Sequence, residues 1–203
     1  MSKLLRCTFI FFFLGCFFLS AQEKQDTILK YPKHWRYEKV NLPLDFAPKM
    51  KHKGFEELRF APGMFDTSAE KYFTYVFVIA IDDETNFSKR KTKKLLYQYY
   101  RGLCAIVAKS SKQDVDVSKI KICLKKTKQP IKSKKTYLGE IQYFDTFNKG
   151  EAILLNIELE TITDKLANKT YIIGLVSPTK KDSDVWKELH TIRKNIYYFK
   201  GGL

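Results

Sequence analysis

Short segments of the chain alternate apolar and polar residues in the manner of half-buried strands. In residues 119–125, Ile120, Ile122 and Leu124 share one face, opposite Lys121 and Cys123. In residues 152–162 one face carries Ile153, Leu155, Ile157 and Leu159, and the other carries Asn156, Glu158 and Glu160. Residues 72–81 are instead apolar on both faces and rich in β-branched and aromatic residues, which is typical of a central strand. The remaining predicted strands are residues 55–60, 136–144 and 170–176.

Two longer segments repeat their apolar residues every three to four positions and predict amphipathic helices. In residues 89–109 the apolar stripe comprises Leu96, Tyr99, Tyr100, Leu103 and Val107. In residues 184–198, which follow Ser183 as a candidate N-cap, the stripe comprises Val185, Leu189, Ile192 and Ile196. We therefore predict an α+β fold, with a single antiparallel sheet of about six strands and two amphipathic helices packed on one face.

The beginning of the chain has the three parts of a secretory signal peptide. Lys3 and Arg6 precede an apolar run that ends at Leu19, and small Ser20 and Ala21 follow it. The run is shorter than the roughly 20 residues that a membrane-spanning helix needs. We predict that residues 1–21 are removed and that the protein is exported, to the periplasm or beyond, with no integral membrane span after processing.

Lipid anchoring at Cys16 is the alternative to cleavage after Ala21. The sequence FLGC resembles a bacterial lipobox, although Phe13 stands where Leu is usual. After the signal peptide we predict a flexible segment at 22–30 and a single α+β domain at 31–203, in which residues 31–50 form an irregular arm rich in aromatic residues and Pro.

The chain is strongly basic, with 37 Lys and Arg against 22 Asp and Glu. An excess of this size favours an anionic envelope component as partner, and export together with the lack of an RNA-recognition motif argues against nucleic acid. Two clusters stand out as an anionic-surface site: Lys89, Arg90, Lys91, Lys93 and Lys94 in the first, and Lys125 and Lys126 in the second. A lysine-rich surface that only keeps the protein in solution is the alternative.

The motif Phe-Ala-Pro-x-Met occurs twice, at 46–50 and at 60–64. Pro62-Gly63 in the second copy predicts a type II turn, so one interpretation is two chain reversals held by Phe and Met packing. The other interpretation is an apolar rim that admits a small ligand, as aromatic residues beside a few polar groups do in many pockets. The candidate ligand-binding residues are Trp35, Phe46, Arg59, Phe60, Met64 and His190.

Few residues point to catalysis or to a metal. The three histidines have no metal-ligand spacing, so we predict neither a metal site nor a cofactor. Glu57 and Asp66 flank the Pro-Gly turn and are candidates for a general acid and base, although an ion pair with Arg59 also explains Glu57. Cys104 and Cys123 are predicted to lie on opposite sides of the sheet, too far apart for a disulfide.

A longer stretch resembles a group of exported bacterial proteins of unknown function that share a Gly-x-Glu-Glu-Leu-Arg-Phe-Ala-Pro-Gly-Met block. It runs from LPLDFAPKM through GFEELRFAPGMFDTSAEKYFTYVFVIAI, and VSPTKKDSDVWKELHTIRKNI adds to it. The resemblance implies an exported single domain whose signature comprises Gly54, Glu57, Arg59, Pro62, Gly63 and Met64. It implies no activity.

These observations favour a non-catalytic exported protein that binds a small ligand or an envelope component. A hydrolase that uses Glu57 and Asp66 is the first alternative. The second is an accessory subunit of an envelope complex, in which a protein partner covers the aromatic patch.

Overall fold

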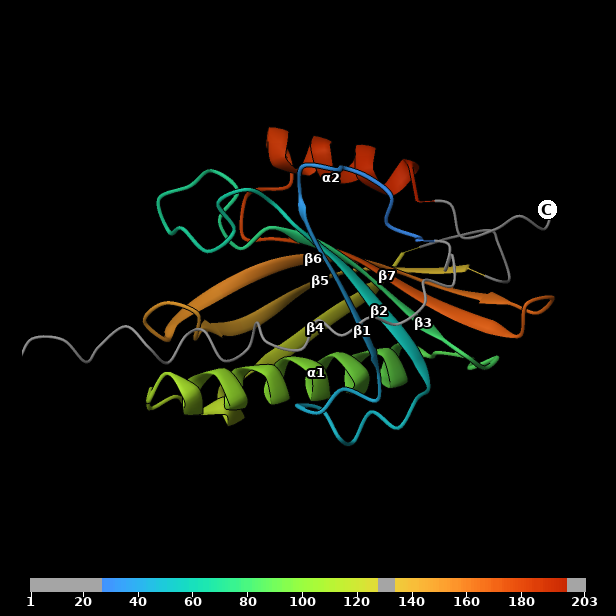
Figure 1. Ribbon diagram of the computed structural model, residues 1–203, viewed down its shortest axis with the longest axis horizontal. Helices are drawn as coiled ribbons and strands as arrows, with labels where there is room; N and C mark the ends of the chain where they lie inside the picture. Colours follow the sequence, from blue (N-terminus) through green and yellow to red (C-terminus); the bar gives the residue numbers. More distant parts are fainter. Residues whose placement is uncertain (1–26, 128–133, 197–203) are drawn as a thin grey trace, which may run out of the picture.

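The computed structural model describes residues 27–127 and 134–196 (Figure 1). Seven strands of these residues form one antiparallel sheet in the order β1-β2-β3-β7-β6-β5-β4. The strands are β1 (Arg36–Leu42), β2 (Gly54–Phe60), β3 (Tyr75–Ile81), β4 (Lys121–Lys126), β5 (Lys134–Asp145), β6 (Glu151–Asp164) and β7 (Lys169–Ser177). The helices are α1 (Lys89–Ser110) and α2 (Asp184–Lys194), and a short 3-10 turn, η2 (Val117–Lys119), precedes β4.

The predicted α+β class and the antiparallel sheet are confirmed. The predicted signal peptide at 1–21, the cleavage site and Cys16 lie outside the described residues. No helix in the described ranges is long and apolar enough to cross a membrane.

The sheet has an edge strand that the sequence pattern did not predict. Residues 36–42 form β1 inside the segment expected to be an irregular arm, and they pair antiparallel with β2 from Arg36 opposite Phe60 to Leu42 opposite Gly54. Most side chains of β1 are exposed or half-buried because the strand has a neighbour on one side only. Such a strand carries no clean apolar alternation, which explains the omission.

The two helices lie on opposite faces of the sheet, so the prediction that both pack on one face is wrong. Figure 1 shows α2 on one side of the strands and α1 on the other. The reason is visible in β3, where all seven residues are buried. Phe77 and Ile79 belong to the core cluster of α1, whereas Val76 and Val78 between them belong to the core cluster of α2.

The predicted apolar stripe of the second helix is buried as a whole: Val185, Leu189 and Ile192 lie on α2, and Ile196 lies just beyond its end. The stripe of the first helix is confirmed in part, because Leu103 and Val107 are only half-buried. On α1 the buried set is Thr92, Leu95, Leu96, Tyr99, Tyr100, Cys104 and Ala108. Cys104 is thus in the core while Cys123 is exposed, and both are free thiols.

Both copies of the Phe-Ala-Pro-x-Met motif are chain reversals. The Met50 N–H donates to the Ala47 carbonyl at 2.8 Å, and the Met64 N–H donates to the Ala61 carbonyl at 3.0 Å. Gly63 has a φ of +80°, as the third residue of a type II turn requires. Both Met side chains are buried in the core cluster of α1, so the structural interpretation of the repeat is confirmed.

The first copy of the motif lies directly against α1. A Cβ atom at Gly102 would come within 2.0 Å of the Phe46 carbonyl oxygen, a separation that no real side chain adopts. The helix therefore approaches this turn at a position where only glycine fits.

We expect Gly102→Ala to destabilise the protein by about 1–3 kcal/mol because the new methyl group overlaps backbone atoms. Helix propensity alone predicts the opposite sign, a gain of about 1 kcal/mol. Urea unfolding measures the difference, with Lys109→Ala on an exposed position of α1 as the control expected to change stability by less than about 0.5 kcal/mol. A more stable Gly102→Ala protein would refute the close approach.

Candidate ligand-binding cavity

A cavity of about 570 Å³ lies between α1 and the β1–β2–β3 side of the sheet. The backbone of α1 lies closest to β4 and β5, at the far side of the sheet from β1, and only its side chains, Tyr99 and Tyr100, reach β3. The space left over β1–β3 is partly closed by the turns that carry the repeated motif. The lining is mainly apolar and includes Leu44, Phe46, Leu58, Phe60, Met64, Phe65, Phe73, Leu103, Ile106, Val107 and Phe147.

The principal polar group in this lining is the carboxyl of Glu56. It lies on β2 opposite Val40 and Ile79, on the face that packs toward α1, and only 1 % of the residue is exposed. The pKa of Glu56 is raised to about 8, mainly by burial. Within this value a hydrogen bond from Tyr99 lowers the pKa and the nearby charge of Glu38 raises it. The carboxyl is therefore mainly protonated at neutral pH.

Glu56 also lacks a full set of hydrogen bonds. Its Oε1 atom is buried and has no hydrogen-bond partner. A buried polar atom without a partner costs about 1–3 kcal/mol, so such atoms are rare and mark places where another molecule can bind.

Four tyrosines surround the same wall of the cavity. The hydroxyls of Tyr75 and Tyr100 are hydrogen-bonded at 2.5 Å, and Tyr99 packs edge-on against Tyr100. The Tyr143 hydroxyl is buried and makes no well-formed hydrogen bond. Burial raises the pKa of Tyr75 and of Tyr99 far above the usual range, so these hydroxyls stay protonated.

The opening of the cavity is apolar as well. Val40, Phe65, Ile106 and Phe147 all line it and are each between 38 % and 49 % exposed. Large hydrophobic side chains left in water at one place indicate a binding surface. The entrance and the interior therefore favour the same kind of ligand.

The structure brings some of the sequence-predicted ligand residues together and separates the others. Phe46, Phe60 and Met64 all line this cavity. Trp35 belongs to the core cluster on the opposite face of the sheet, under α2, and is 1 % exposed. Arg59 and His190 do not line the cavity either, and each has a role in packing.

Glu57 and Arg59 hold the segment that precedes β1. The Glu57 Oε2 atom accepts hydrogen bonds from the backbone N–H of Ile28 at 2.9 Å and of Leu29 at 2.8 Å. Arg59 donates to the carbonyl of Leu29 at 3.0 Å and to that of Trp35 at 2.9 Å. Glu57 and Arg59 are separated by the single residue Leu58, so both side chains point to the α2 face of the sheet, away from the cavity.

Asp66 lies in a different environment from Glu57. It is exposed and accepts hydrogen bonds from the Ser68 N–H at 2.9 Å and from the Ser68 hydroxyl at 2.7 Å, which lower its pKa. It borders a recess at the Pro-Gly turn together with Phe60 and Gly63, and Glu57 is not part of that recess. The structure does not bring the two proposed catalytic carboxylates together.

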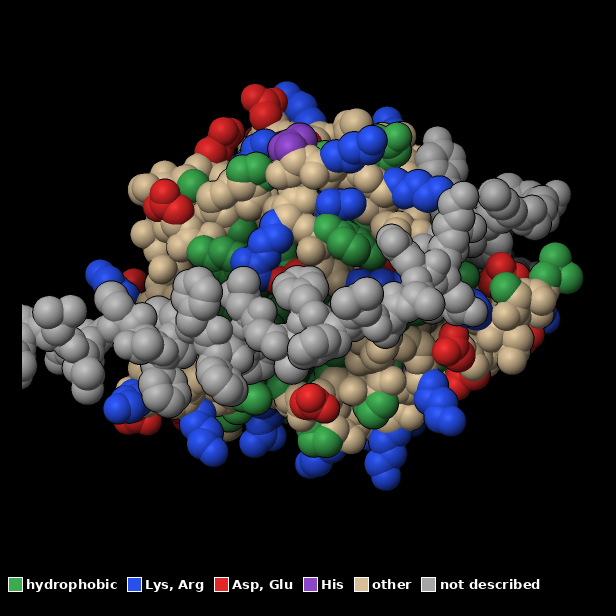
Figure 2. Space-filling view, in the orientation of Figure 1, with side chains coloured by type: hydrophobic (Ala, Val, Ile, Leu, Met, Phe, Trp, Pro, Cys, Tyr) green, Lys and Arg blue, Asp and Glu red, His purple; other side chains and the backbone are tan. Residues whose placement is uncertain are grey.

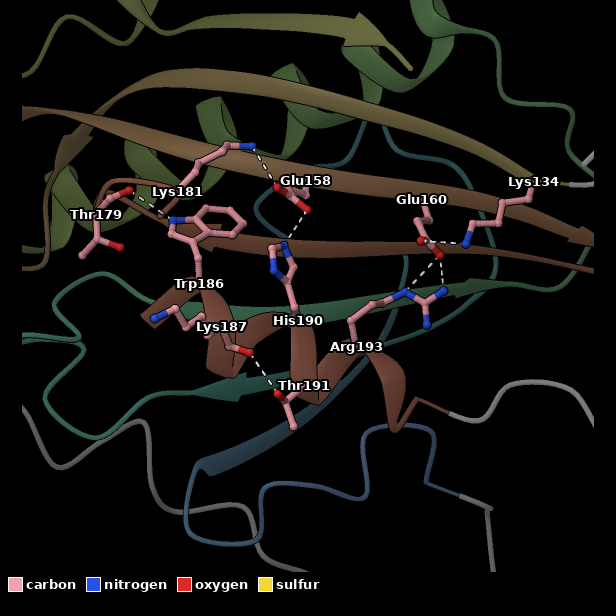
Figure 3. A network of polar contacts seen from close by, with 10 residues as sticks. All are labelled: Lys134, Glu158, Glu160, Thr179, Lys181, Trp186, Lys187, His190, Thr191 and Arg193. Carbon is pink, nitrogen blue, oxygen red and sulfur yellow. Dashed lines mark hydrogen bonds and ion pairs between the residues drawn. The ribbon is translucent and has the colours of Figure 1, made fainter. Parts of the chain in front are cut away.

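His190 takes part in a network that fastens α2 to β6 (Figure 3). Its Nε2 atom lies 3.0 Å from Glu158, whose other oxygen pairs with Lys181 at 3.1 Å. One turn later Arg193 donates to Glu160, which also pairs with Lys134. Trp186 on the same helix is buried, and its indole N–H donates to the Thr179 carbonyl at 3.1 Å.

The two basic clusters converge in space. The cations at the start of α1 are exposed, and so are Lys125 and Lys126 on β4. Lys135 on β5 donates to the Phe87 carbonyl at 2.9 Å, just before α1, and β5 pairs with β4, where Lys126 lies opposite Tyr137, so Lys135 lies near both clusters. Burial lowers the pKa of Lys135, and the charges of Lys126 and Lys91 lower it as well. Figure 2 shows Lys and Arg side chains projecting along the edge of the molecule that carries α1.

The sequence pattern alone did not single out Glu56. The available signal was the period of two in GFEELRF, which puts Glu56 on the face of Leu58 and Phe60 and puts Glu57 on the other. From the sequence alone, the tyrosines are expected only to pack within the helix and the strands. Their convergence on Glu56 depends on how α1 crosses the sheet.

Comparisons with known proteins find distant structural likenesses. One similar solved structure is cyanobacterial PsbP (CyanoP) from Synechocystis, with 12% sequence identity, a TM-score of 0.40, and coverage of 82% of this chain and 84% of that chain. Another is PA94, a protein of unknown function from Pseudomonas aeruginosa, with 12% identity, a TM-score of 0.33, and coverage of 85% and 90%. No family model and no curated protein matches the chain. Likenesses this distant carry no argument about function.

We expect Glu57→Gln to lower the free energy of unfolding by about 1–3 kcal/mol, because the amide can no longer accept both buried N–H bonds with a charged oxygen. Asp66→Asn is the matched control: the exposed side chain keeps an accepting oxygen, and the change should stay within about 0.5 kcal/mol. Urea unfolding of the three proteins measures both effects. Equal stability of wild type and Glu57→Gln would contradict the anchoring role.

Proposed function

We propose that this protein is an exported, non-catalytic binding protein that holds an apolar small molecule in the cavity beneath α1. The observation that carries the proposal is the fully buried Glu56 carboxyl, with an unpartnered oxygen, in the wall of a cavity whose interior and mouth are apolar. Export rests on the signal peptide that the sequence predicts.

The energetics of the site support binding. Protein interiors are packed nearly as densely as organic crystals, so a cavity of about 570 Å³ beside a well-packed core costs stability. Its size falls in the range of pockets that enclose small molecules, about 300–1,000 Å³. A ligand that fills the space and satisfies Glu56 would offset both costs.

The chemistry of the lining supports binding over catalysis. General acid-base catalysis needs groups that exchange protons near the working pH. Around Glu56 the other titratable groups in the interior are tyrosine hydroxyls whose pKa values are raised by burial, so they stay neutral. Glu56 itself can exchange a proton near neutral pH, but the tyrosines beside it cannot serve as the second group of an acid-base pair.

We expect the wild-type protein to bind the uncharged apolar dye Nile red, and Val107→Trp to weaken binding by about tenfold or more because the indole fills the cavity. Dye fluorescence titration gives the dissociation constants. Lys109→Trp is the matched control, since two residues along α1 the same side chain points to the opposite face and into solvent.

Two results would contradict the proposed function. The first is an absence of dye binding by a wild-type protein whose circular dichroism shows the fold to be intact. The second is equal dye affinity for Val107→Trp and Lys109→Trp.

We further propose that the basic edge beside α1 docks the protein on an anionic membrane surface. The convergence of Lys91 and Lys126 around Lys135 supports this second role. Each cation near such a surface contributes up to about 1 kcal/mol, and salt screens the attraction.

We expect co-sedimentation with phosphatidylglycerol vesicles at low salt, lost at high salt, and weakened about tenfold or more in a Lys91→Glu and Lys126→Glu double variant. A Lys180→Glu and Lys194→Glu double variant carries the same change of net charge on the α2 side and serves as the control. Equal loss in both double variants, or binding that salt does not reduce, would argue against this docking edge.

A further inference from the structure

The charge distribution around the cavity restricts the polar part of its ligand. Among the residues that the structure describes, four with a carboxyl or guanidinium group line the cavity: Arg36, Glu38, Asp45 and Glu56. Arg36, Glu38 and Asp45 are exposed or half-exposed residues at the rim, whereas Glu56 is buried. No Lys or Arg side chain among the lining residues reaches the buried wall, in a protein whose overall charge is strongly positive.

The one rim cation is already engaged. Arg36 forms an ion pair with Glu38, and its guanidinium lies over the rings of Phe60 and Phe65 at 5.4 and 5.6 Å. An anionic head group in the interior would therefore meet no free cation, and it would lie beside Glu56 with Glu38 nearby. Burial of an unpaired anion is strongly unfavourable.

The buried wall offers hydrogen bonds of both kinds. A protonated Glu56 has an O–H that donates and a carbonyl oxygen that accepts, and the Tyr143 hydroxyl can do either. Two buried groups with unused hydrogen-bonding capacity, Glu56 Oε1 and the Tyr143 hydroxyl, line the same cavity. A hydroxyl or a carbonyl group of a ligand matches them, because each can be satisfied without any charge.

Resting on the proposed function, we infer that the ligand is an uncharged amphiphile: an apolar chain or ring system with one hydroxyl or carbonyl head that hydrogen-bonds to Glu56. The apolar body occupies the space lined by Leu58, Leu103 and Val107, and the head lies at the tyrosine-lined wall. Long-chain alcohols, isoprenoid alcohols and quinones have this chemistry, whereas fatty-acid anions and lipophilic ammonium ions do not.

The proton on Glu56 decides between an uncharged head and a cationic one. The groups that interact with this carboxyl are Glu38 from β1 and Tyr99 and Tyr100 from α1, while Tyr75 from β3 and Tyr143 from β5 line the same cavity. None of them is a cation, and Glu38 opposes a second negative charge, so the neutral carboxyl is the favoured form at neutral pH. A cationic head would require this carboxyl to ionise in an apolar wall.

The affinity for an uncharged ligand is expected to decrease with rising pH. The raised pKa of about 8 means that Glu56 keeps its proton below this pH and loses it above. If only the protonated form binds an uncharged head, the apparent affinity falls as the pH rises through 8, by about tenfold between pH 7 and pH 9.

The experiment compares decanol, decanoic acid and decylamine as competitors of Nile red on the full-length mature protein. The three molecules share one apolar chain and differ only in the charge of the head at pH 7. We expect decanol to bind at least about tenfold more tightly than either charged analogue, and decanol affinity to fall about tenfold from pH 7 to pH 9.

Glu56→Gln provides the matched variant, because glutamine is uncharged, similar in shape and able to donate and accept hydrogen bonds. We expect it to retain decanol binding within about threefold at pH 7 and to lose the fall between pH 7 and pH 9. Asp45→Asn, a change of the same kind at an exposed residue of the rim, should keep the wild-type fall.

Each alternative outcome has a distinct meaning. The inference about the head group is overturned if decylamine or decanoic acid binds as tightly as decanol, or if Glu56→Gln keeps the fall in affinity with pH. The proposed function still holds in these cases as long as Nile red binds. Failure of all three chains to displace bound Nile red also overturns the inference. Failure of Nile red itself to bind refutes the proposed function instead.

Discussion

Burial of β3 on both of its faces is the constraint from which the rest of the architecture follows. A strand that is apolar on both sides needs a cover on each side, and this chain has one amphipathic helix for each. α2 covers the face of Val76 and Val78, and α1 belongs to the core on the face of Phe77 and Ile79. The backbone of α1 lies closest to β4 and β5, so only its side chains and the loops cover β1–β3, and the cavity forms there.

The two faces of β2 have different roles: one holds the segment before β1, and the other forms part of the cavity wall. On the α2 face, Glu57 and Arg59 fix the segment before β1 through its backbone groups. On the α1 face, Glu56 is buried at the cavity wall, and Phe60 and Met64 continue the lining into the Pro-Gly turn. The GFEELRFAPGM block therefore holds the segment before β1, forms part of the cavity wall and reverses the chain. From the sequence alone, Glu57 in this block also fits a catalytic interpretation.

The proposed functions use the two ends of α1 in different ways. Its C-terminal half supplies Leu103, Ile106 and Val107 to the cavity and its mouth. Its N-terminal half carries the cations that meet those of β4 near Lys135. A protein that carries apolar molecules at a membrane surface would use both, because electrostatic attraction brings it to the lipid and the cavity takes up the cargo.

The sequence by itself determined the strands with clear alternation, the two helices and their apolar stripes, the turn at Pro62-Gly63 and the separation of Cys104 from Cys123, because each depends on local periodicity or on turn chemistry. It did not determine β1, whose edge position removes the alternation. It also did not determine the side on which each helix packs, although the double-faced apolar pattern of residues 72–81 already required two covers. The meeting of Glu56 with the tyrosines of α1, β3 and β5 was decided only by the tertiary structure, because these residues are far apart in the chain and their contact depends on where one helix crosses one sheet.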